Sequence, residues 1–358
     1  MRKVTKTKIF GLLAPVAVAL FSAAPATLGQ SSGVTLNVAT FGGHSGDVEK
    51  GYVGDRMTRM TGVKIEWTHG NPSDFFAKML ASRGRQAPFD VVLLDDAVQD
   101  AAIKAGVVAK LDPALVPNLA KLYPRARNPQ GYGPYAILYS VGIVYNKDKL
   151  KAAGIAEPTS WQDLWNPKLA GHISIPDISL PQGADFVMKM AQLNGGSEAD
   201  VIPGLKKIAE IKANSYYTSS NTLGQQLASG DVWVSVWTSG RAWAMINQGF
   251  PIGYAIPKEG SVLGIDTVDM VTGTAHPKEA QAFINIQIDP LSQLGWAMEM
   301  AYGPSNATLQ SVFEAYPELA RMMPSSEADL KKLYSPNWSV YNANLAKATD
   351  YWNRNVKH

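Results

Sequence analysis

Phe89-Asp-Val-Val-Leu-Leu94 is the stretch of sequence that says most about the fold, and Asp95-Asp96 follows it directly. Its apolar run is continuous, which is typical of parallel strands that are buried on both faces of a sheet. Before it, β-rich runs at 35–40 and 63–67 alternate with helical segments at 48–60 and 72–82. This βαβαβ order predicts the opening of a doubly wound sheet. Ligands of such sheets bind beyond the carboxyl ends of the strands, where the loop from Phe41 to Ser45 and the Asp95-Asp96 pair are expected.

A second series of strands and helices begins after residue 140. Strands are expected at 141–145, 171–177, 231–237, 250–256 and 267–273, and helices at 183–193, 201–211, 221–228, 238–247 and from 277 onward. Ser160 and Asp163 have the spacing of a capping box at the start of a short helix. The renewed alternation indicates a second lobe, so the predicted fold class is α/β with two doubly wound lobes.

Residues 1–26 have the pattern of a cleaved secretory signal peptide. Basic residues cluster within 1–8, an apolar stretch runs from 9 to 24, and Ala24-Pro-Ala26 fits a small-x-small cleavage site. A membrane anchor is the alternative, but Gly11 and Pro15 interrupt the apolar stretch, and spanning a bilayer takes about 20 apolar residues. We therefore expect a mature chain that starts near Thr27 and is soluble in the periplasm.

Composition and motif spacing exclude several kinds of chemistry. The 358 residues include no cysteine, which excludes disulfides, thiolate metal sites and a cysteine nucleophile. The 33 basic and 30 acidic residues are spread along the chain, so no nucleic-acid partner is expected. The five histidines show no metal-ligand spacing, and no phosphate-binding loop of the G-x-x-x-x-G-K-[ST] type occurs. Gly43-His-Ser-Gly-Asp47 resembles a hydrolase G-x-S-x-G elbow, but Asp47 stands where that motif needs glycine. We expect no enzymatic activity, no metal and no cofactor.

Several short motifs occur in an order that resembles a known family. They are Thr61-Gly-Val63, Phe89-Asp-Val-Val92, Pro158-Thr-Ser-Trp-Gln-Asp-Leu-Trp-Asn-Pro167, Gly230-Asp-Val232, Trp237 and Ile256-Pro-Lys-Glu-Gly260. Together they are similar to the spermidine/putrescine-binding branch of the bacterial extracellular solute-binding proteins, over nearly the whole mature chain. The resemblance implies a periplasmic binding protein fold of type II, with a ligand cleft between two lobes that close about a hinge. It implies lobe 1 at 27–139 plus 270–358 and lobe 2 at 140–269, with crossings near Tyr139 and Asp269.

The resemblance also implies how a polyamine is bound, with aromatic rings stacked on its alkyl chain and a carboxylate beside each ammonium group. The candidate ligand-binding residues are Phe41, His44, Asp95, Asp96, Asp177, Trp237, Arg241, Asp266 and Tyr302. Two positions depart from the family. Gly264 replaces a tryptophan two residues before Asp266, and Arg241 brings a guanidinium near a helix N-terminus, which suits an anion. The expected ligand is a polyamine or related small amine, and a carboxylate or aminophosphonate is the alternative.

Each candidate residue except Asp266 also has a structural explanation. Asp95, Asp96 and Asp177 could cap helices. The aromatic candidates could pack in the interior, and Arg241 and His44 could be solvated.

The expected function is that of the solute-binding component of an ABC importer, which closes on a small molecule and presents it to the membrane permease subunits. A monomer is expected. Tyr216-Tyr217 resembles the tyrosine pair of ferric-ion-binding relatives, but it precedes the strand that such a pair follows, so an iron carrier is not expected.

Overall fold

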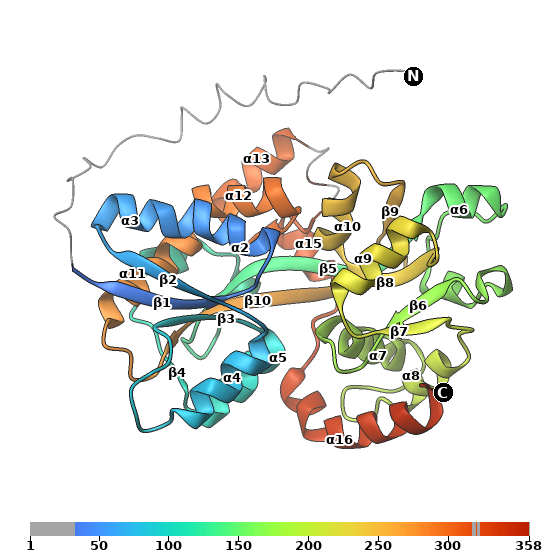
Figure 1. Cartoon of the computed structure of the whole chain (residues 1–358), viewed down its shortest axis with the longest axis horizontal. Coiled ribbons are helices and arrows are strands. Elements are labelled where there is room, and N and C mark those ends of the chain that lie inside the picture. Colours follow the sequence, from blue (N-terminus) through green and yellow to red (C-terminus); the bar gives the residue numbers. More distant parts are fainter. Residues whose placement is uncertain (1–32, 317–319, 321–322, 358) are drawn as a thin grey trace.

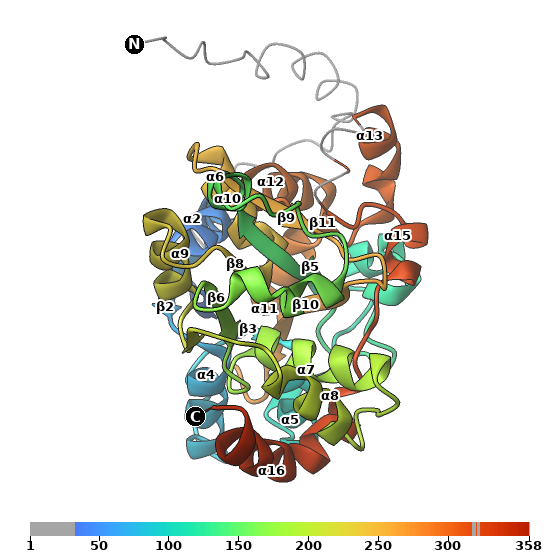
Figure 2. The ribbon, with the colours of Figure 1, turned by 90° about the vertical axis from the view of Figure 1, so that its right-hand side faces the viewer.

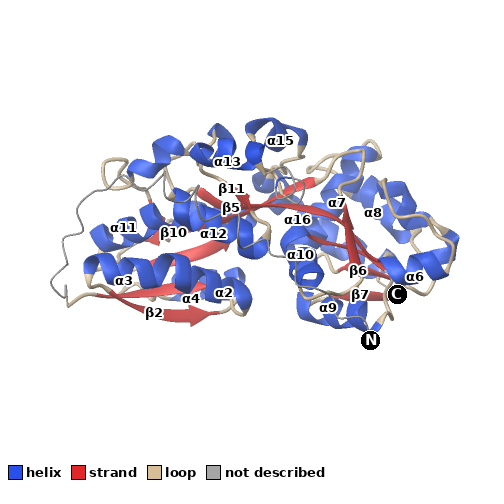
Figure 3. Cartoon of the chain, turned by 90° about the horizontal axis from the view of Figure 1, so that it is seen from above, coloured by secondary structure: helices blue, strands red, loops and turns tan. Residues whose placement is uncertain are grey.

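Two α/β lobes lie side by side in the computed structural model, which describes residues 33–316, 320 and 323–357 (Figures 1 and 3). The predicted signal peptide at 1–26 lies outside the described residues. None of the helices in the described ranges has both the length and the apolar character needed to cross a membrane.

Strand β3 (Val91–Asp95) is central to lobe 1 and confirms the prediction from the apolar run. Its side chains alternate between two buried clusters, with Val91 and Leu93 in one and Val92 and Leu94 in the other. Since successive side chains of a strand point to opposite faces, both faces of the sheet are covered.

Lobe 1 follows the predicted βαβαβ order. Its elements up to residue 109 are β1 (Thr35–Thr40), α2 (His44–Glu49), the π-helical stretch η1 (Lys50–Gly54), α3 (Asp55–Thr61), β2 (Lys64–His69), α4 (Pro72–Ala81), β3, α5 (Asp96–Ala105) and β4 (Val108–Ala109). Strand β1 pairs in parallel with both β2 and β3. Helix α3 is followed by Gly62, which is its C-cap, as predicted. Gly62 has a left-handed φ of 73°, a conformation that favours glycine. The first helix begins at His44, earlier than expected, so the carboxyl end of β1 leads almost directly into it.

Lobe 2 is built around a second parallel set of strands. Its elements are α6 (Lys147–Ala152), the 3₁₀ turns η4 (Trp161–Trp165) and η5 (Pro167–Leu169), β6 (Ile173–Pro176), α7 (Pro181–Leu193), α8 (Ile202–Ala209), β7 (Ser215–Tyr217), α9 (Ser220–Ser229), β8 (Val234–Thr238), α10 (Ser239–Asn247) and β9 (Ile252–Ala255). Strand β6 is parallel to β7 and β8. The capping box of Ser160 and Asp163 forms as predicted, but the turn it starts is a 3₁₀ turn. Strand β7 was not expected from the sequence.

Two long strands, β5 (Tyr135–Asn146) and β10 (Val262–Val271), connect the lobes (Figure 1). They pair with each other in the middle of the molecule, while β10 also pairs with β3 of lobe 1 and β5 with β8 of lobe 2. Hydrogen bonding therefore runs without a break in the order β2-β1-β3-β10-β5-β8-β6-β7. Because both strands serve both lobes, the predicted boundaries at 139/140 and 269/270 remain a prediction.

The remaining elements lie on lobe 1 or reach back across both lobes. They are η2 (Pro117–Lys121), η3 (Pro124–Ala126), α11 (Pro277–Gln287), α12 (Pro290–Met300), β11 (Gly303–Pro304), η6 (Ala307–Leu309), α13 (Gln310–Ala315), α15 (Glu327–Lys332) and α16 (Trp338–Asn355). The single long helix expected from 277 is divided, because Asp289 caps a new helix whose first residue is Pro290.

Helix α16 contacts α5 of lobe 1 and α8 of lobe 2 (Figure 2). The Asn342 side chain donates a hydrogen bond of 3.2 Å to the Ala97 carbonyl, and near the other end the Tyr216 hydroxyl donates one of 2.6 Å to the Val356 carbonyl. The C-terminal helix therefore bridges the two lobes.

Trp352 attaches this helix to lobe 2. Its side chain is 0% exposed and meets the Tyr216 ring edge-on at 5.5 Å. Trp352→Ala should lower the free energy of unfolding by about 3–5 kcal/mol, because it leaves a cavity in a packed interior. Val340→Ala on the same helix is the control, since Val340 is 36% exposed and its loss should change stability by about 0.5 kcal/mol or less. Urea unfolding measures the free energy of unfolding of both variants. A small change in Trp352→Ala, equal to that in Val340→Ala, would contradict the role of Trp352 in attaching the helix to lobe 2.

Candidate functional site

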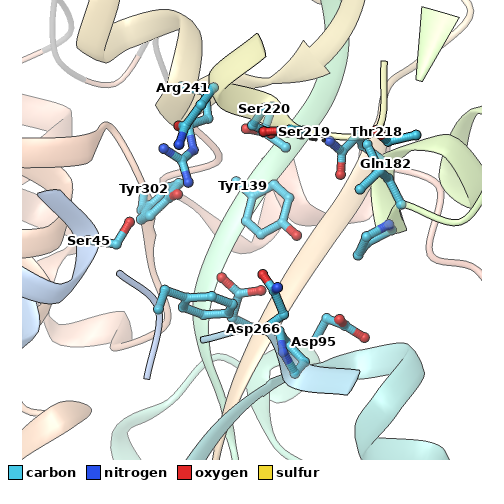
Figure 4. A pocket seen from close by; sticks show the side chains of 17 residues that line it. Ser45, Asp95, Tyr139, Gln182, Thr218, Ser219, Ser220, Arg241, Asp266 and Tyr302 are labelled. Atoms are coloured by element: carbon cyan, nitrogen blue, oxygen red, sulfur yellow. Dashed lines mark hydrogen bonds between the residues drawn. The ribbon is translucent and has the colours of Figure 1, made fainter. Parts of the chain in front are cut away.

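A pocket of about 360 Å³ lies between the lobes, beside the crossing of β5 and β10 (Figure 4). This volume is in the range of small-molecule sites. Five residues predicted from the sequence line it: Phe41, Asp95, Arg241, Asp266 and Tyr302. They come from the carboxyl ends of β1 and β3, from β10, from the start of α10 and from the segment after α12. The tertiary structure thus brings together residues that are up to 261 positions apart in sequence.

The other four predicted residues do not line this pocket. Asp96 begins α5, one residue beyond Asp95. The half-exposed His44 has its Nε2 atom 3.7 Å from the Glu299 carboxylate. A ligand contact by any of the four remains a prediction.

Asp177 and Trp237 are engaged elsewhere. The Asp177 carboxylate accepts hydrogen bonds from Lys357 Nζ at 2.8 Å and from the Ser179 N–H at 3.0 Å, and these contacts lower its pKa against the opposing effect of burial. Trp237 is buried under α9, where its indole N–H donates to the Ser220 hydroxyl at 3.2 Å. Because Ser220 lines the pocket, Trp237 supports one of its walls.

Two buried carboxylates form the lobe 1 side of the pocket. Asp95 and Asp266 are 5% and 8% exposed and stand opposite each other in the register of β3 and β10. Asp95 also caps α5, because its Oδ1 atom accepts a hydrogen bond from the Val98 N–H at 2.8 Å. The predicted capping role and a place in the pocket are thus combined in one residue.

The charge of both groups is poorly stabilised in the absence of a ligand. Burial raises the pKa of Asp95 to about 6. Burial, together with the negative charge of Asp95, raises the pKa of Asp266 well above its usual range, although Arg241 opposes this. Neither carboxylate forms an ion pair with a basic residue in the part of the chain that the structure describes.

The lobe 2 side of the pocket has the opposite electrostatic character. Ser219 and Ser220 at the start of α9 line it, as do Thr238 and Arg241 at the start of α10. Neither helix has a side-chain cap on its N-terminal N–H groups. Figure 4 shows Arg241 and Ser220 across the cavity from Asp95 and Asp266. The pocket therefore has a carboxylate end and an end that attracts negative charge.

Tyr139 was expected only as a crossing point, yet its ring lines the pocket. It is paired with Gly264 in the register of β5 and β10. A Cβ atom at residue 264 would lie 2.0 Å from the Tyr139 ring, so a larger residue would require this ring to move. The Tyr139 ring also lies 5.7 Å from that of Tyr302. The aromatic surface that the resemblance implies at 264 is therefore provided by the neighbouring strand, a relation that depends on strand register and has no local sequence signal.

The described residues include no group of three or more histidine, aspartate or glutamate side chains placed to hold a metal ion. The arrangement offers a pocket of small-molecule size between two lobes, lined by charged, polar and aromatic side chains. These features define a two-lobed solute-binding protein.

Comparisons with known proteins also indicate a solute-binding protein, and they show its family. The chain belongs to the family of bacterial extracellular solute-binding proteins, which it matches over residues 53–321. It is 28% identical to the putrescine-binding periplasmic protein SpuD of Pseudomonas aeruginosa, over 78% of this chain and 82% of that protein. It is 24% identical to the gamma-aminobutyric acid-binding protein of Pseudomonas aeruginosa, over 94% of this chain and 95% of the relative. A crystal structure of an ABC transporter protein from Clostridium perfringens has a TM-score of 0.74 at 25% identity, covering 90% of this chain and all of that one.

The stability of the ligand-free protein should depend on the ionisation of Asp95. Its pKa rises from an ordinary 3.8 to about 6 on folding, so the folded state binds the proton more tightly than the unfolded chain. The resulting stabilisation is complete below about pH 4 and is lost as the pH rises through about 6. Asp95→Asn keeps the helix cap but cannot ionise. Relative to the wild type, the variant should gain up to about 3 kcal/mol between about pH 4 and pH 7.5.

Urea unfolding of both proteins across this pH range measures the difference, and comparing them removes the acid denaturation that they share. A stability difference that does not change with pH would show that the Asp95 carboxylate is not desolvated in the folded protein.

Proposed function

We propose that this protein is the periplasmic solute-binding component of an ABC importer and that its ligand is a small organic amine, with putrescine or spermidine as the main candidates. The buried pair of Asp95 and Asp266, which faces the cavity without an ion pair to any basic side chain of the described residues, carries this proposal. A buried carboxylate needs an opposite charge or hydrogen-bond donors, and an ammonium group supplies both.

The named relatives support an amine as well. One is a putrescine-binding protein and another a gamma-aminobutyric acid-binding protein, and both compounds carry a primary ammonium group. They differ at the other end of the molecule. The amine end is therefore the feature that the proposed ligand shares with the ligands of both relatives.

The aromatic rings of the pocket would complete this binding mode. Phe41, Tyr139 and Tyr302 all line it, and their faces suit an alkyl chain that ends in a cation. In the proposed cycle the amine docks on the lobe 1 carboxylates, lobe 2 closes over it, and the closed form is presented to the permease subunits. The protein acts as an exported monomer with a cleaved signal peptide, and it has no nucleic-acid partner and no enzymatic activity.

Removing the charge of Asp266 tests the amine site. Putrescine or spermidine should bind the wild type with measurable heat in isothermal titration. Asp266→Asn should weaken that binding by about 2 kcal/mol or more, because the ammonium loses a desolvated partner. Asp148→Asn removes the same charge from the exposed start of α6 and should change affinity less than about twofold. Binding of a carboxylate or aminophosphonate with no heat from any amine would contradict the proposal.

A second candidate is the same transport role for a ligand that carries an anionic group. Arg241 and the uncapped starts of α9 and α10 meet at one end of the pocket. Within the described residues, the Arg241 guanidinium makes neither a hydrogen bond nor an ion pair. A carboxylate or phosphonate fits this end. A ligand with both groups, such as an amino acid with a terminal amine, would use both ends.

Arg241→Gln separates the two candidates. For 4-aminobutyrate, the variant should lose about tenfold or more in affinity, because a charge-assisted hydrogen bond to the carboxylate is removed. Putrescine should bind the variant as well as the wild type or more tightly, because a positive charge has left the pocket. Titration of both proteins with putrescine, 4-aminobutyrate and succinate gives the comparison. An equal loss for all three ligands would indicate a structural role for Arg241.

A further inference from the structure

Glu49 is a buried carboxyl group of lobe 1 that is not among the residues lining the pocket. It is the last residue of α2 and is 0% exposed. Burial raises its pKa from an ordinary 4.5 to about 8, although a hydrogen bond from Gln287 opposes the rise. A buried carboxylate needs an opposite charge or enough hydrogen-bond donors, so the contacts of Glu49 decide whether it is ionised.

One hydrogen bond joins Glu49 to Gln287 of α11. The Gln287 Nε2 atom donates to Glu49 Oε2 at 3.1 Å. The second oxygen of the carboxyl group, Glu49 Oε1, and the amide oxygen, Gln287 Oε1, are both buried and have no hydrogen-bond partner among the described residues. Two acceptors on one pair of side chains therefore lack a donor.

A single proton would supply the missing donor. An ionised carboxylate and an amide oxygen only accept hydrogen bonds, so neither can satisfy the other. A protonated carboxyl group has an O–H donor. With the proton on Glu49 Oε1, this atom donates to Gln287 Oε1 while Gln287 Nε2 donates to Glu49 Oε2. The two planar groups then form a reciprocal acid–amide pair.

The charged groups on the surrounding elements do not stabilise an ionised Glu49. Helix α2 contacts η1 and α12, and η1 contacts α3 and α11. Arg56 of α3 is paired with Asp289 at 2.6 Å, and Glu299 of α12 accepts a hydrogen bond from the Tyr52 hydroxyl at 3.3 Å. Burial and the Gln287 hydrogen bond are the causes of the altered pKa of Glu49, with no contribution from a charged residue. The other titratable residues of these elements are at exposed or half-buried positions: His44, Asp47, Lys50, Asp55, Arg59, Lys278 and Glu279.

The pair lies at one end of a buried polar network. The Gln287 carbonyl accepts a hydrogen bond of 3.0 Å from Gln293 Nε2, which also donates to the Ala136 carbonyl of β5 at 2.9 Å. At the other end, Ser45 lines the pocket one helical turn before Glu49. The Glu49–Gln287 contact therefore connects the helix that begins at the pocket to the helices that hold the crossing strand β5.

We propose that Glu49 is held as a neutral acid in a reciprocal pair with Gln287, and that this pair is a pH-sensitive contact of lobe 1. While Glu49 carries its proton, the pair is intact and joins α2 to α11. Ionisation in alkaline solution places a negative charge beside the Gln287 amide oxygen and weakens the packing of α2. The contact is separate from the ligand site, so it does not depend on which solute the protein binds.

Glu49→Gln tests the proposal, because a glutamine supplies the N–H donor that the proton supplies in the wild type but cannot ionise. The folded-state pKa is raised, so the stabilisation is complete below about pH 4.5 and is lost as the pH rises through about 8. The folding equilibrium constant of the wild type relative to Glu49→Gln should fall about 50-fold or more between pH 5 and pH 7, and about tenfold further by pH 9. Urea unfolding without ligand measures this ratio.

Glu66→Gln is the matched control, since Glu66 lies at an exposed position of β2. Its folding equilibrium constant relative to the wild type should change less than about threefold over the same pH range, because an exposed carboxylate has similar surroundings in the folded and unfolded chain.

Carbon NMR of wild-type protein labelled only at glutamate side-chain carboxyls gives a second measurement, which does not require the variant to fold. One glutamate resonance should titrate with a midpoint near pH 8, and aspartates do not contribute to the spectrum. A pH-independent ratio for Glu49→Gln, or a spectrum in which every glutamate titrates below about pH 6, would show that Glu49 is ionised at neutral pH and would overturn the proposal.

Discussion

Strands β5 and β10 belong to both lobes at once within one continuous sheet, and the rest of the molecule depends on this. The N-terminal parts of the two strands pair with each other, while the C-terminal part of β5 pairs with β8 of lobe 2 and that of β10 with β3 of lobe 1. Backbone hydrogen bonds are strong and must be satisfied in a buried sheet, so the lobes cannot separate without breaking a continuous ladder. They can rotate only by twisting or bending these strands. Tyr139 and Asp266 lie in the section where β5 and β10 pair with each other, and both line the pocket. A rotation of the lobes about this section would therefore act directly on these two pocket residues.

Desolvation of acidic side chains is the second constraint. Asp95, Asp266 and Asp185 are all buried, and none forms an ion pair with a basic side chain of the described residues, although Arg241 acts on Asp266 from across the pocket. A protein selected only for stability would replace these groups by apolar or amide side chains, since buried unpaired charges are unfavourable. Their presence is understandable if a ligand supplies the missing charge, because binding to the folded form then returns the lost stability. The Asp95 carboxylate has two roles, because it caps α5 and also lines the pocket.

Local sequence patterns predicted the elements well where one periodicity was unbroken. The strand at 35–40 and the glycine cap at 62 were confirmed at those residues. The predictions differed from the structure where long-range packing determines the length or the existence of an element. Strand β5 is 12 residues long because its two ends pair with different strands, and β7 forms because β6 offers an unpaired edge. The helix expected from 277 is broken by the cap at Asp289, a signal present in the sequence as Asp289-Pro290.

The site could be predicted only in part, because some of its residues carry a local or family signal and others are placed by long-range packing. Asp95 could be predicted from its place at the end of a buried strand, and Asp266 and Tyr302 from the family resemblance. The role of Tyr139 could not be predicted, because nothing local distinguishes one tyrosine in a strand from any other.

The sequence by itself determined that the protein is a two-lobed α/β protein of the solute-binding family, because hydrophobic periodicity, capping residues and ordered motifs are local properties of the chain. Only the tertiary structure decided which charges meet. Asp95 and Asp266 come from β3 and β10, and they are neighbours because the pairing of β10 with β3 brings them together. Contacts between residues so far apart depend on strand register and lobe orientation, which a single sequence does not encode in any local pattern.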